Sequence, residues 1–388
     1  MRRWALISLC LTMAVLCNTA CVGVAFDTIV NDNVSPTSAA FAWDGVSSHP
    51  DSMTVISTRT EKELHYHFGY KYENASAAGI SDIVSFVRGE YYSVAVGYEK
   101  DMYSIPDLGS FLSDRSYPLS GLVARPRQIL DGSAGDLSVM EAQSLIWESM
   151  GFPVGLLSAL DRHDSYWDDM APETPAIESC SPLFVAENKS YIDPAEKTLL
   201  SFSPADITVQ IDLSIPVVVK QGLNVDIECA FACLSGIPSY VTLMSQLMER
   251  KDLGKTYIPL SPDMSGKYVG TLRTLGLFSP DLPTFVGGPG ILYLYFLTSR
   301  YENGEKIYHI SQPIVRNLWS ALGSSYTSLE NKIMSRSSLS NQYYLNVSSY
   351  AIDLPVITIS KIVEGDVKFE WEDGEEFEGT EPEEPEFN

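Results

Sequence analysis

The 388-residue chain lacks any apolar run long enough to cross a bilayer. A membrane-spanning helix needs about 20 consecutive apolar residues, and the mainly apolar run from Trp4 to Cys17 falls short of that length. We therefore expect no transmembrane helix. Basic residues are also scarce, because 26 Lys and Arg stand against 50 Asp and Glu and give a formal net charge of −24. A polyanion repels nucleic acid, so no nucleic-acid partner is expected.

Cysteine is rare as well, and only four of the six cysteines lie beyond the apolar leader: Cys21, Cys180, Cys229 and Cys233. On an extended strand, Cys229 and Cys233 would lie about 13 Å apart. A disulfide needs Cα atoms within about 7 Å, so this pair cannot bridge. We interpret both as small buried residues beside Phe231. Whether Cys180 forms a disulfide stays open, and no second ligand pair stands at zinc-finger spacing.

No motif for a nucleophilic serine, a zinc protease or a phosphate loop is present in the chain. The segment 287–290, Gly-Gly-Pro-Gly, precedes an expected strand and is interpreted as a turn. His65 and His67 share one strand face without a third ligand, so we interpret that face as solvated. The acidic segment 161–169 around His163 is interpreted as a surface loop, with calcium binding or proton transfer as the alternative. We therefore predict no enzyme, no metal and no cofactor.

The N-terminus has the order of a secretory signal: Arg2 and Arg3, the apolar run, then small residues. The segment 18–21, Asn-Thr-Ala-Cys, resembles a lipobox. We predict that residues 1–20 form a lipoprotein signal peptide and that Cys21 is lipidated, which would anchor the chain in the outer membrane. The alternative is cleavage after Ala25, which would leave an unmodified mature chain beginning at Phe26.

Period-two alternation dominates the chain beyond the signal segment and predicts a mostly β protein. The clearest strand places Ile207, Val209, Ile211, Leu213 and Ile215 on one face and polar residues on the other. Further strands are expected at 53–57, 64–72, 91–98, 227–234 and 343–347. The run 291–297 is apolar on both faces and predicts a central strand. It continues into a hairpin through Asn303-Gly304 that returns along 306–310.

Helices are expected at few places. Ser138 and Glu141 form a capping-box pattern, and Gly151 stands where a helix-terminating glycine belongs. We expect this helix to pack on the first domain, and a weaker helix over 314–322. Prolines near residues 193–205 indicate a domain boundary. The expected organisation is two tandem β-sandwich domains, at 21–200 and 206–372, with one or two short helices.

The C-terminal segment 366–372 alternates Val367, Phe369 and Trp371 with charged residues. We predict that it adds to a sheet edge, either within its own second domain or in a partner's groove. Residues 364–388 carry twelve acids against one lysine, a net charge of −11. The segment 373–388 is predicted to be a disordered acidic tail.

The order of several short segments resembles one known family. These segments are Ala40–Asp44, His49–Met53, Arg88–Tyr92, Val217–Gly236, Leu272–Gly276 and the strand from Ile291. Taken in this order over residues 35–315, they look like the fimbrillin-like lipoproteins of Bacteroides and Porphyromonas relatives. The resemblance implies two tandem seven-stranded-type sandwiches, export as a lipoprotein, and a non-enzymatic role in type V pili or as a surface adhesin, with other fimbrial subunits or cell-surface proteins as partners.

Shaft subunits of that family lose a first strand after cleavage at an arginine. The only arginine between Cys21 and Arg88 is Arg59, which falls inside an expected strand. We therefore favour an anchor, tip or accessory subunit that works through strand pairing over a polymerising shaft subunit. The alternative function is a glycan-binding outer-membrane lipoprotein whose Tyr and Trp side chains stack on sugars.

Overall fold

The computed structural model describes residues 34–372 apart from short internal gaps. These gaps are 45–48, 60–68, 77–78, 81–82, 100, 106–121, 131–137, 160–174, 195–196, 244–246, 249–252, 277–290, 312, 319–325, 329–342, 346–348 and 364–365. The predicted signal peptide, Cys21, both histidines at 65 and 67, the acidic segment 161–169, the glycine-rich segment 287–290 and the tail 373–388 lie outside the described residues. In the described part of the chain, no helix has the length and apolarity to cross a bilayer.

The chain divides into two compact units. The first contains residues 1–97, 110–117 and 186–204, and the second contains 98–109, 118–185 and 205–388. The expected domains, at 21–200 and 206–372, divide the chain differently. Residues 118–185 were expected in the first domain but belong to the second unit. The physical reason is strand pairing: β9 (Ala176–Ile177) runs parallel to β17 (Leu253–Pro262).

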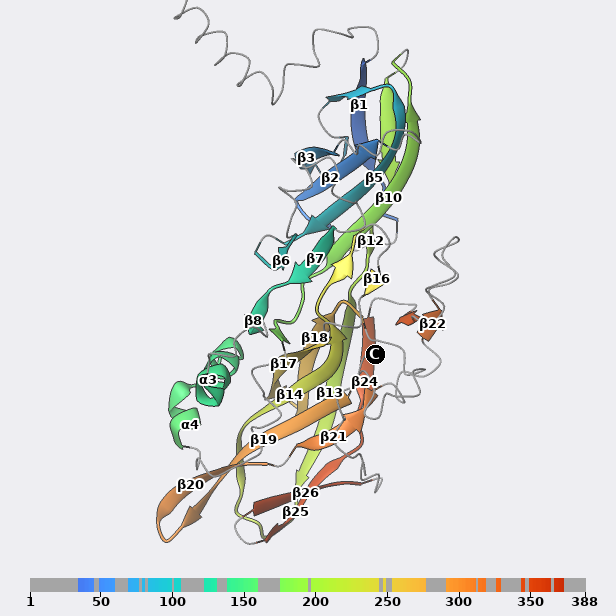
Figure 1. Cartoon of the computed structure of the whole chain (residues 1–388). Helices are drawn as coiled ribbons and strands as arrows, with labels where there is room; N and C mark the ends of the chain where they lie inside the picture. The colour runs from blue at the N-terminus through green and yellow to red at the C-terminus, as the bar shows by residue number, and fades with distance from the viewer. Residues whose placement is uncertain are drawn as a thin grey trace, which may run out of the picture. The chain divides into compact units, whose positions relative to one another are not determined.

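The first unit is a β-sandwich made of two sheets. The smaller sheet has the order β11-β1-β4, and the larger contains β10-β5-β2-β3 (Figure 1). The strands are β1 (Val34–Phe41), β2 (Ser52–Arg59), β3 (Gly69–Ser76), β4 (Val84–Val87), β5 (Gly89–Tyr98), β10 (Leu183–Ile192) and β11 (Thr198–Phe202). Side chains from both sheets share one core, which includes Ala39, Val55, Phe86, Tyr91 and Phe202. The predicted strands at 53–57 and 91–98 are confirmed.

A twelve-stranded sheet forms most of the second unit, with the main order β20-β19-β14-β17-β18-β13-β25-β26. These strands are β13 (Val209–Val219), β14 (Asp226–Pro238), β17, β18 (Lys267–Thr274), β19 (Ile291–Glu302), β20 (Glu305–Ile310), β25 (Ile357–Val363) and β26 (Asp366–Trp371). Four short strands pair beside this path, namely β8 (Gln128–Leu130), β9, β21 (Ile314–Asn317) and β24 (Ser349–Asp353).

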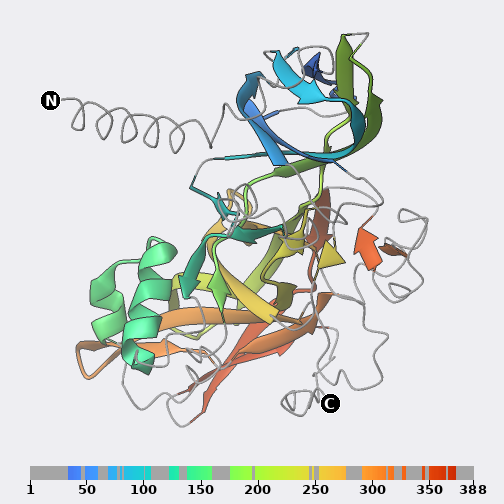
Figure 2. The ribbon, with the colours of Figure 1, turned by 45° about the horizontal axis from the view of Figure 1, so that its top comes forward.

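The remaining elements of the second unit are short. They are β6 (Tyr103–Ser104), β7 (Val123–Pro126), β12 (Ala205–Asp206), β15 (Val241–Thr242), β16 (Leu247–Met248), β22 (Tyr326–Ser328), β23 (Tyr343–Leu345), α3 (Val139–Ser149) and α4 (Val154–Ala159). Both helices lie beside the β19–β20 hairpin (Figures 1 and 2).

The large sheet curls so that its two halves face each other across one core. The core receives Ile211 and Leu213 from β13, Ala232 from β14 and Phe296 from β19. Tyr268 on β18 meets Phe296 edge-on with ring centroids 5.7 Å apart, although β18 and β19 are not neighbours in the sheet. The mostly β prediction is therefore confirmed. In the second unit a further cluster, which contains Trp147 of α3 and Phe231 of β14, lies apart from this core.

The strongest local predictions of strand, turn and helix end are confirmed. On β13, residues 209, 211, 213 and 215 are buried and alternate with half-buried polar residues. The prediction is wrong at its start, because Ile207 lies before β13 and is half-buried whereas Thr208 is buried. Asn303 and Gly304 have φ values of 51° and 88°, as a two-residue hairpin turn requires. Ser138 and Glu141 form the reciprocal capping box that begins α3, and Gly151 has a φ of 74° just past its end.

Two helix predictions need correction. The helix α3 packs on the second unit, where Trp147 meets Phe231 of β14 edge-on with centroids 6.1 Å apart. The expectation that it packs on the first domain is therefore wrong. The weaker helix over 314–322 is also wrong at its start, because Ile314–Asn317 is β21, paired antiparallel with β19. The β-branched Ile314 and Val315 suit a strand better than a helix.

Candidate functional site

The C-terminal strand β26 ends the large sheet. It pairs antiparallel with β25, with Ile357 opposite Trp371 and Ile359 opposite Phe369. No second strand pairs with β26 among the described residues, so one side of its backbone is an edge. The strand predicted over 366–372 is thus present, and it lies within its own second unit. Its role in adding to a partner stays a prediction.

Three apolar side chains hold β26 onto the core. Val367 is buried with Val225 and Ile359 in a small cluster. The ring of Phe369 stacks on Phe296 of β19, with centroids 5.1 Å apart and planes tilted by 18°. This stacking joins the last strand of the sheet to the opposite layer, so β26 is an integral part of the sandwich.

Trp371 also contacts the opposite layer. The guanidinium of Arg316, on β21, lies 5.1 Å from the centroid of the Trp371 ring, within range of a cation–π contact. The indole Nε1 is shielded from solvent and has no hydrogen-bond acceptor in the part of the chain that the structure describes. A shielded donor of this kind is costly unless a partner supplies an acceptor.

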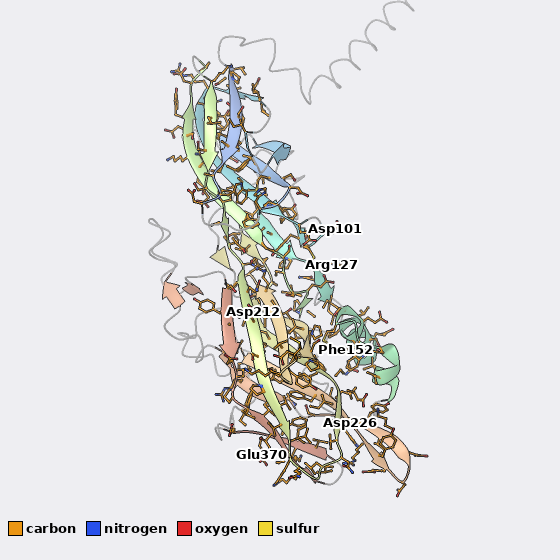
Figure 3. The ribbon with its side chains drawn as sticks, turned by 180° about the vertical axis from the view of Figure 1, so that it is seen from behind. Asp101, Arg127, Phe152, Asp212, Asp226 and Glu370 are labelled. Atoms are coloured by element: carbon orange, nitrogen blue, oxygen red, sulfur yellow. The ribbon has the colours of Figure 1, made fainter. Side chains whose placement is uncertain are left out.

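The hydrogen-bond pattern shows which backbone groups face the free side of β26. Glu372 donates its backbone N–H to the carbonyl oxygen of Val356 at 2.9 Å. Bonded pairs alternate along an antiparallel ladder, so Glu370 also faces β25, whereas Phe369 and Trp371 direct their backbone N–H and C=O groups outward. Glu370 has an exposed side chain and is labelled in Figure 3. Charged side chains on an edge strand discourage indiscriminate pairing.

The candidate processing residue Arg59 is the last residue of β2, and its Cα partner is Tyr91 on β5. A Cβ added at Gly89 would lie 2.5 Å from Arg59 Nε, so this half-buried side chain packs closely over the glycine. The backbone up to Arg59 is therefore held in a ladder. The residues after it, 60–68, lie outside the described part, so cleavage at Arg59 stays untested.

The cysteines of the second unit lie in or beside apolar clusters. Cys180, Cys229 and Cys233 form no disulfide in the described part of the chain, and Cys229 and Cys233 pack in the cluster that contains Phe231, as predicted. Burial is the main reason why the pKa of Cys180 is raised to about 12, and the same cause raises the pKa of Cys229 to about 12. A thiol with such a pKa stays protonated at neutral pH and is a poor nucleophile.

A polar network around Arg273 of β18, with partners on β12, on β13 and between them, could not be predicted from the sequence. Arg273 donates from Nη1 to Asp206 at 2.7 Å and to Thr208 at 2.9 Å, and from Nη2 to Gln210 at 2.6 Å. Alternation alone placed Thr208 and Gln210 on the wet face of their strand. The partner was missed because the pairing of Gln210 with Arg273 depends on the register of two strands. Its closed set of donors and acceptors indicates a structural role.

No group of three or more His, Cys, Asp or Glu side chains that could hold a metal occurs among the described residues. The three segments considered as metal, acid–base or phosphate sites lie outside the described residues, so the expectations for them remain untested.

Comparison with family models gives no match, and neither does comparison with curated proteins. Solved structures do resemble the chain. A candidate adhesin from Bacteroides ovatus matches with a TM-score of 0.47 and 12% identity over 85% of this chain and 94% of its own. A candidate polysaccharide-binding protein from Bacteroides thetaiotaomicron matches with a TM-score of 0.46 and 12% identity over 88% and 99%.

The fimbrial anchor protein Mfa2 from Porphyromonas gingivalis matches with a TM-score of 0.44 and 12% identity, over 87% of this chain and 95% of its own. At this identity the likeness concerns the fold alone.

Proposed function

We propose that the protein is a non-enzymatic cell-surface lipoprotein that acts as an anchor, tip or accessory subunit of a fimbrium. In this proposal, the free edge of β26 receives a strand of a neighbouring subunit. The proposal combines the order of the family-like segments with the structure of the second unit. The observation that carries it is the edge strand itself, which is fixed to the core on one face and has backbone groups available on one side.

Three properties of β26 suit strand addition. Its outward N–H and C=O groups supply the main-chain bonds that give affinity in this mode of recognition. The stacking of Phe369 on Phe296 holds the strand before a partner arrives, which limits the ordering cost of binding. The exposed charge of Glu370 limits indiscriminate pairing along the edge.

Site-specific cross-linking in the native envelope tests this edge. In Glu370→Cys, the introduced thiol replaces an exposed side chain on β26. Cys180 and Cys233 are buried, and burial raises the pKa of the half-buried Cys229, so these native thiols react slowly with the label. A thiol-attached photo-cross-linker should then capture another surface subunit. Met264→Cys is the matched control, because Met264 is fully exposed in the turn after β17. Capture of nothing from position 370, or equal capture from both positions, contradicts strand addition at β26.

The anchor is proposed at Cys21. Each buried CH₂ of an acyl chain contributes about 0.8 kcal/mol, so several chains make attachment stable. We expect Cys21→Ala to move the protein from the membrane fraction to the soluble fraction. Intact-mass analysis of the mature N-terminus decides the chemistry: a diacyl or triacyl adduct on Cys21 supports the anchor, and an unmodified chain beginning at Phe26 contradicts it.

A further inference from the structure

The β19–β20 hairpin extends one face of the sheet past the core that α3 covers. That core contains Tyr295, Leu297 and Ile310, and Tyr308 packs against its border. Cross-strand partners in an antiparallel pair point to the same face. Ser299 is paired with Tyr308, and Tyr301 with Lys306, so these four side chains continue the same face toward the turn.

A β-bulge adds a carboxylate to this face. The register between β14 and β19 shifts between Ile227 and Cys229, which leaves Glu228 as the extra residue. Its carboxylate accepts hydrogen bonds from Ser299 Oγ and, at 2.7 Å, from Lys306 Nζ. Asp226, the partner of Ser299, marks this region in Figure 3.

Two tyrosines flank the ion pair. The ammonium of Lys306 lies 5.3 Å from the centroid of the Tyr308 ring. Tyr301 lies across the ladder from Lys306 and is 69% exposed. We name Glu228, Tyr301, Lys306 and Tyr308 the hairpin platform; Ser299, which is 1% exposed, holds Glu228 in place beneath it.

The chemistry of the hairpin platform selects one kind of ligand. Lys306 and Glu228 neutralise each other. Around them Arg300 stands against Glu302, Glu305 and Asp226, the exposed partner of Ser299, so this region keeps a net negative charge. The platform therefore presents hydrogen-bond donors and acceptors in surroundings that repel acidic ligands. The aromatic faces of Tyr301 and Tyr308 add apolar surface with a negative quadrupole, which attracts C–H groups.

A pyranose ring combines an apolar C–H face with a rim of hydroxyl groups, and so matches both features. A protein partner fits less well, because the exposed apolar surface here centres on one tyrosine flanked by polar groups. We propose that the hairpin platform binds a neutral carbohydrate chain, a function separate from strand addition at β26.

Affinity gel electrophoresis of the mature chain tests this proposal with galactomannan, yeast mannan and mixed-linkage β-glucan as neutral polymers and polygalacturonate as the acidic control. We expect at least one neutral polymer to retard the wild-type protein. Tyr301→Ala should weaken that retention about tenfold, the loss typical of an exposed aromatic anchor, without lowering the unfolding midpoint. Tyr191→Ala is the matched control, because Tyr191 is 53% exposed in the first unit; it should retain binding.

Three results overturn the proposal. The first is absence of retardation by all three neutral polymers. The second is equal retention of Tyr301→Ala and wild type. The third is retention by polygalacturonate as strong as by the neutral polymers, since that would require a net positive site. None of these results bears on cross-linking at position 370, so the strand-addition proposal is tested separately.

Discussion

The two hairpins that end the large sheet are held in different ways. The β25–β26 hairpin directs Val367, Phe369 and Trp371 against the core. The β19–β20 hairpin is attached near its turn by polar contacts, chiefly the bond between Glu228 and Lys306, and leaves Tyr301 exposed. An edge strand fixed by apolar contacts contributes to stability, whereas one fixed by polar contacts leaves its face available to solvent and ligands.

The largest effect is expected from the double change Phe369→Ser and Trp371→Ser. Both rings are partly buried and pack on the main core, and Phe369 stacks on Phe296. Loss of buried aromatic side chains costs about 3–5 kcal/mol each when fully buried, so we expect the second unit to lose about 3–5 kcal/mol for the pair. Denaturant unfolding, followed by the fluorescence of the remaining tryptophans, measures the change.

Glu370→Ser is the control on the same strand, because Glu370 is exposed and its loss should change the free energy of unfolding by less than about 0.5 kcal/mol. If the double variant is as stable as this control and assembles normally, the segment 366–372 behaves as a tail and the packing described for β26 is not important for stability.

A smaller effect is expected at the turn of the other hairpin. Gly304 has a φ of 88°, and an alanine there must adopt a conformation that L residues disfavour. We expect Gly304→Ala to destabilise the second unit by about 1 kcal/mol. Gly155→Ala is the matched control in α4, where an added Cβ meets no atom within 4 Å and φ is not positive. Equal unfolding midpoints for the two variants would show that the turn is not constrained.

The sequence predicted local structure well wherever neighbouring residues decide the conformation. Alternation along 209–215 identified the buried face of β13, and Asn303-Gly304 identified the hairpin turn. Ser138 and Glu141 likewise identified the start of α3. Each of these signals depends on a few adjacent residues, so no knowledge of the tertiary fold was needed.

The sequence failed where distant segments meet. The surface on which α3 packs depends on Phe231 and Tyr295, which lie far along the chain. The platform residue Glu228 is positioned by a bulge, and the strand register that creates a bulge is not encoded by alternation. The partner of Val367, Phe369 and Trp371 also stayed open, because the alternating pattern fits an edge of the same domain and an edge of a partner equally well.

The smallest effect, and the one most specific to the polar hairpin, is expected from Glu228→Gln. Hydrogen bonds from Lys306 and then Ser299 hold the pKa of Glu228 below its ordinary value of 4.5. A carboxyl group whose pKa is lower in the folded state stabilises the fold above the unfolded-state pKa, and that stabilisation is lost as pH falls through the folded-state pKa. The glutamine keeps a hydrogen-bond acceptor for Ser299 but removes the charge that Lys306 contacts. We therefore expect the wild type to exceed Glu228→Gln by about 0.5–1 kcal/mol in free energy of unfolding at pH 7. The free energies of unfolding of the two proteins should converge as pH falls below 4.5.

Urea unfolding from pH 7 to pH 3 measures the difference. Glu305→Gln, an exposed change in the same hairpin, is the control, and its free energy of unfolding should follow that of the wild type at every pH. A difference between wild type and Glu228→Gln that is constant with pH would mean that the charge of Glu228 does not hold the hairpin, and that packing at its base does so instead.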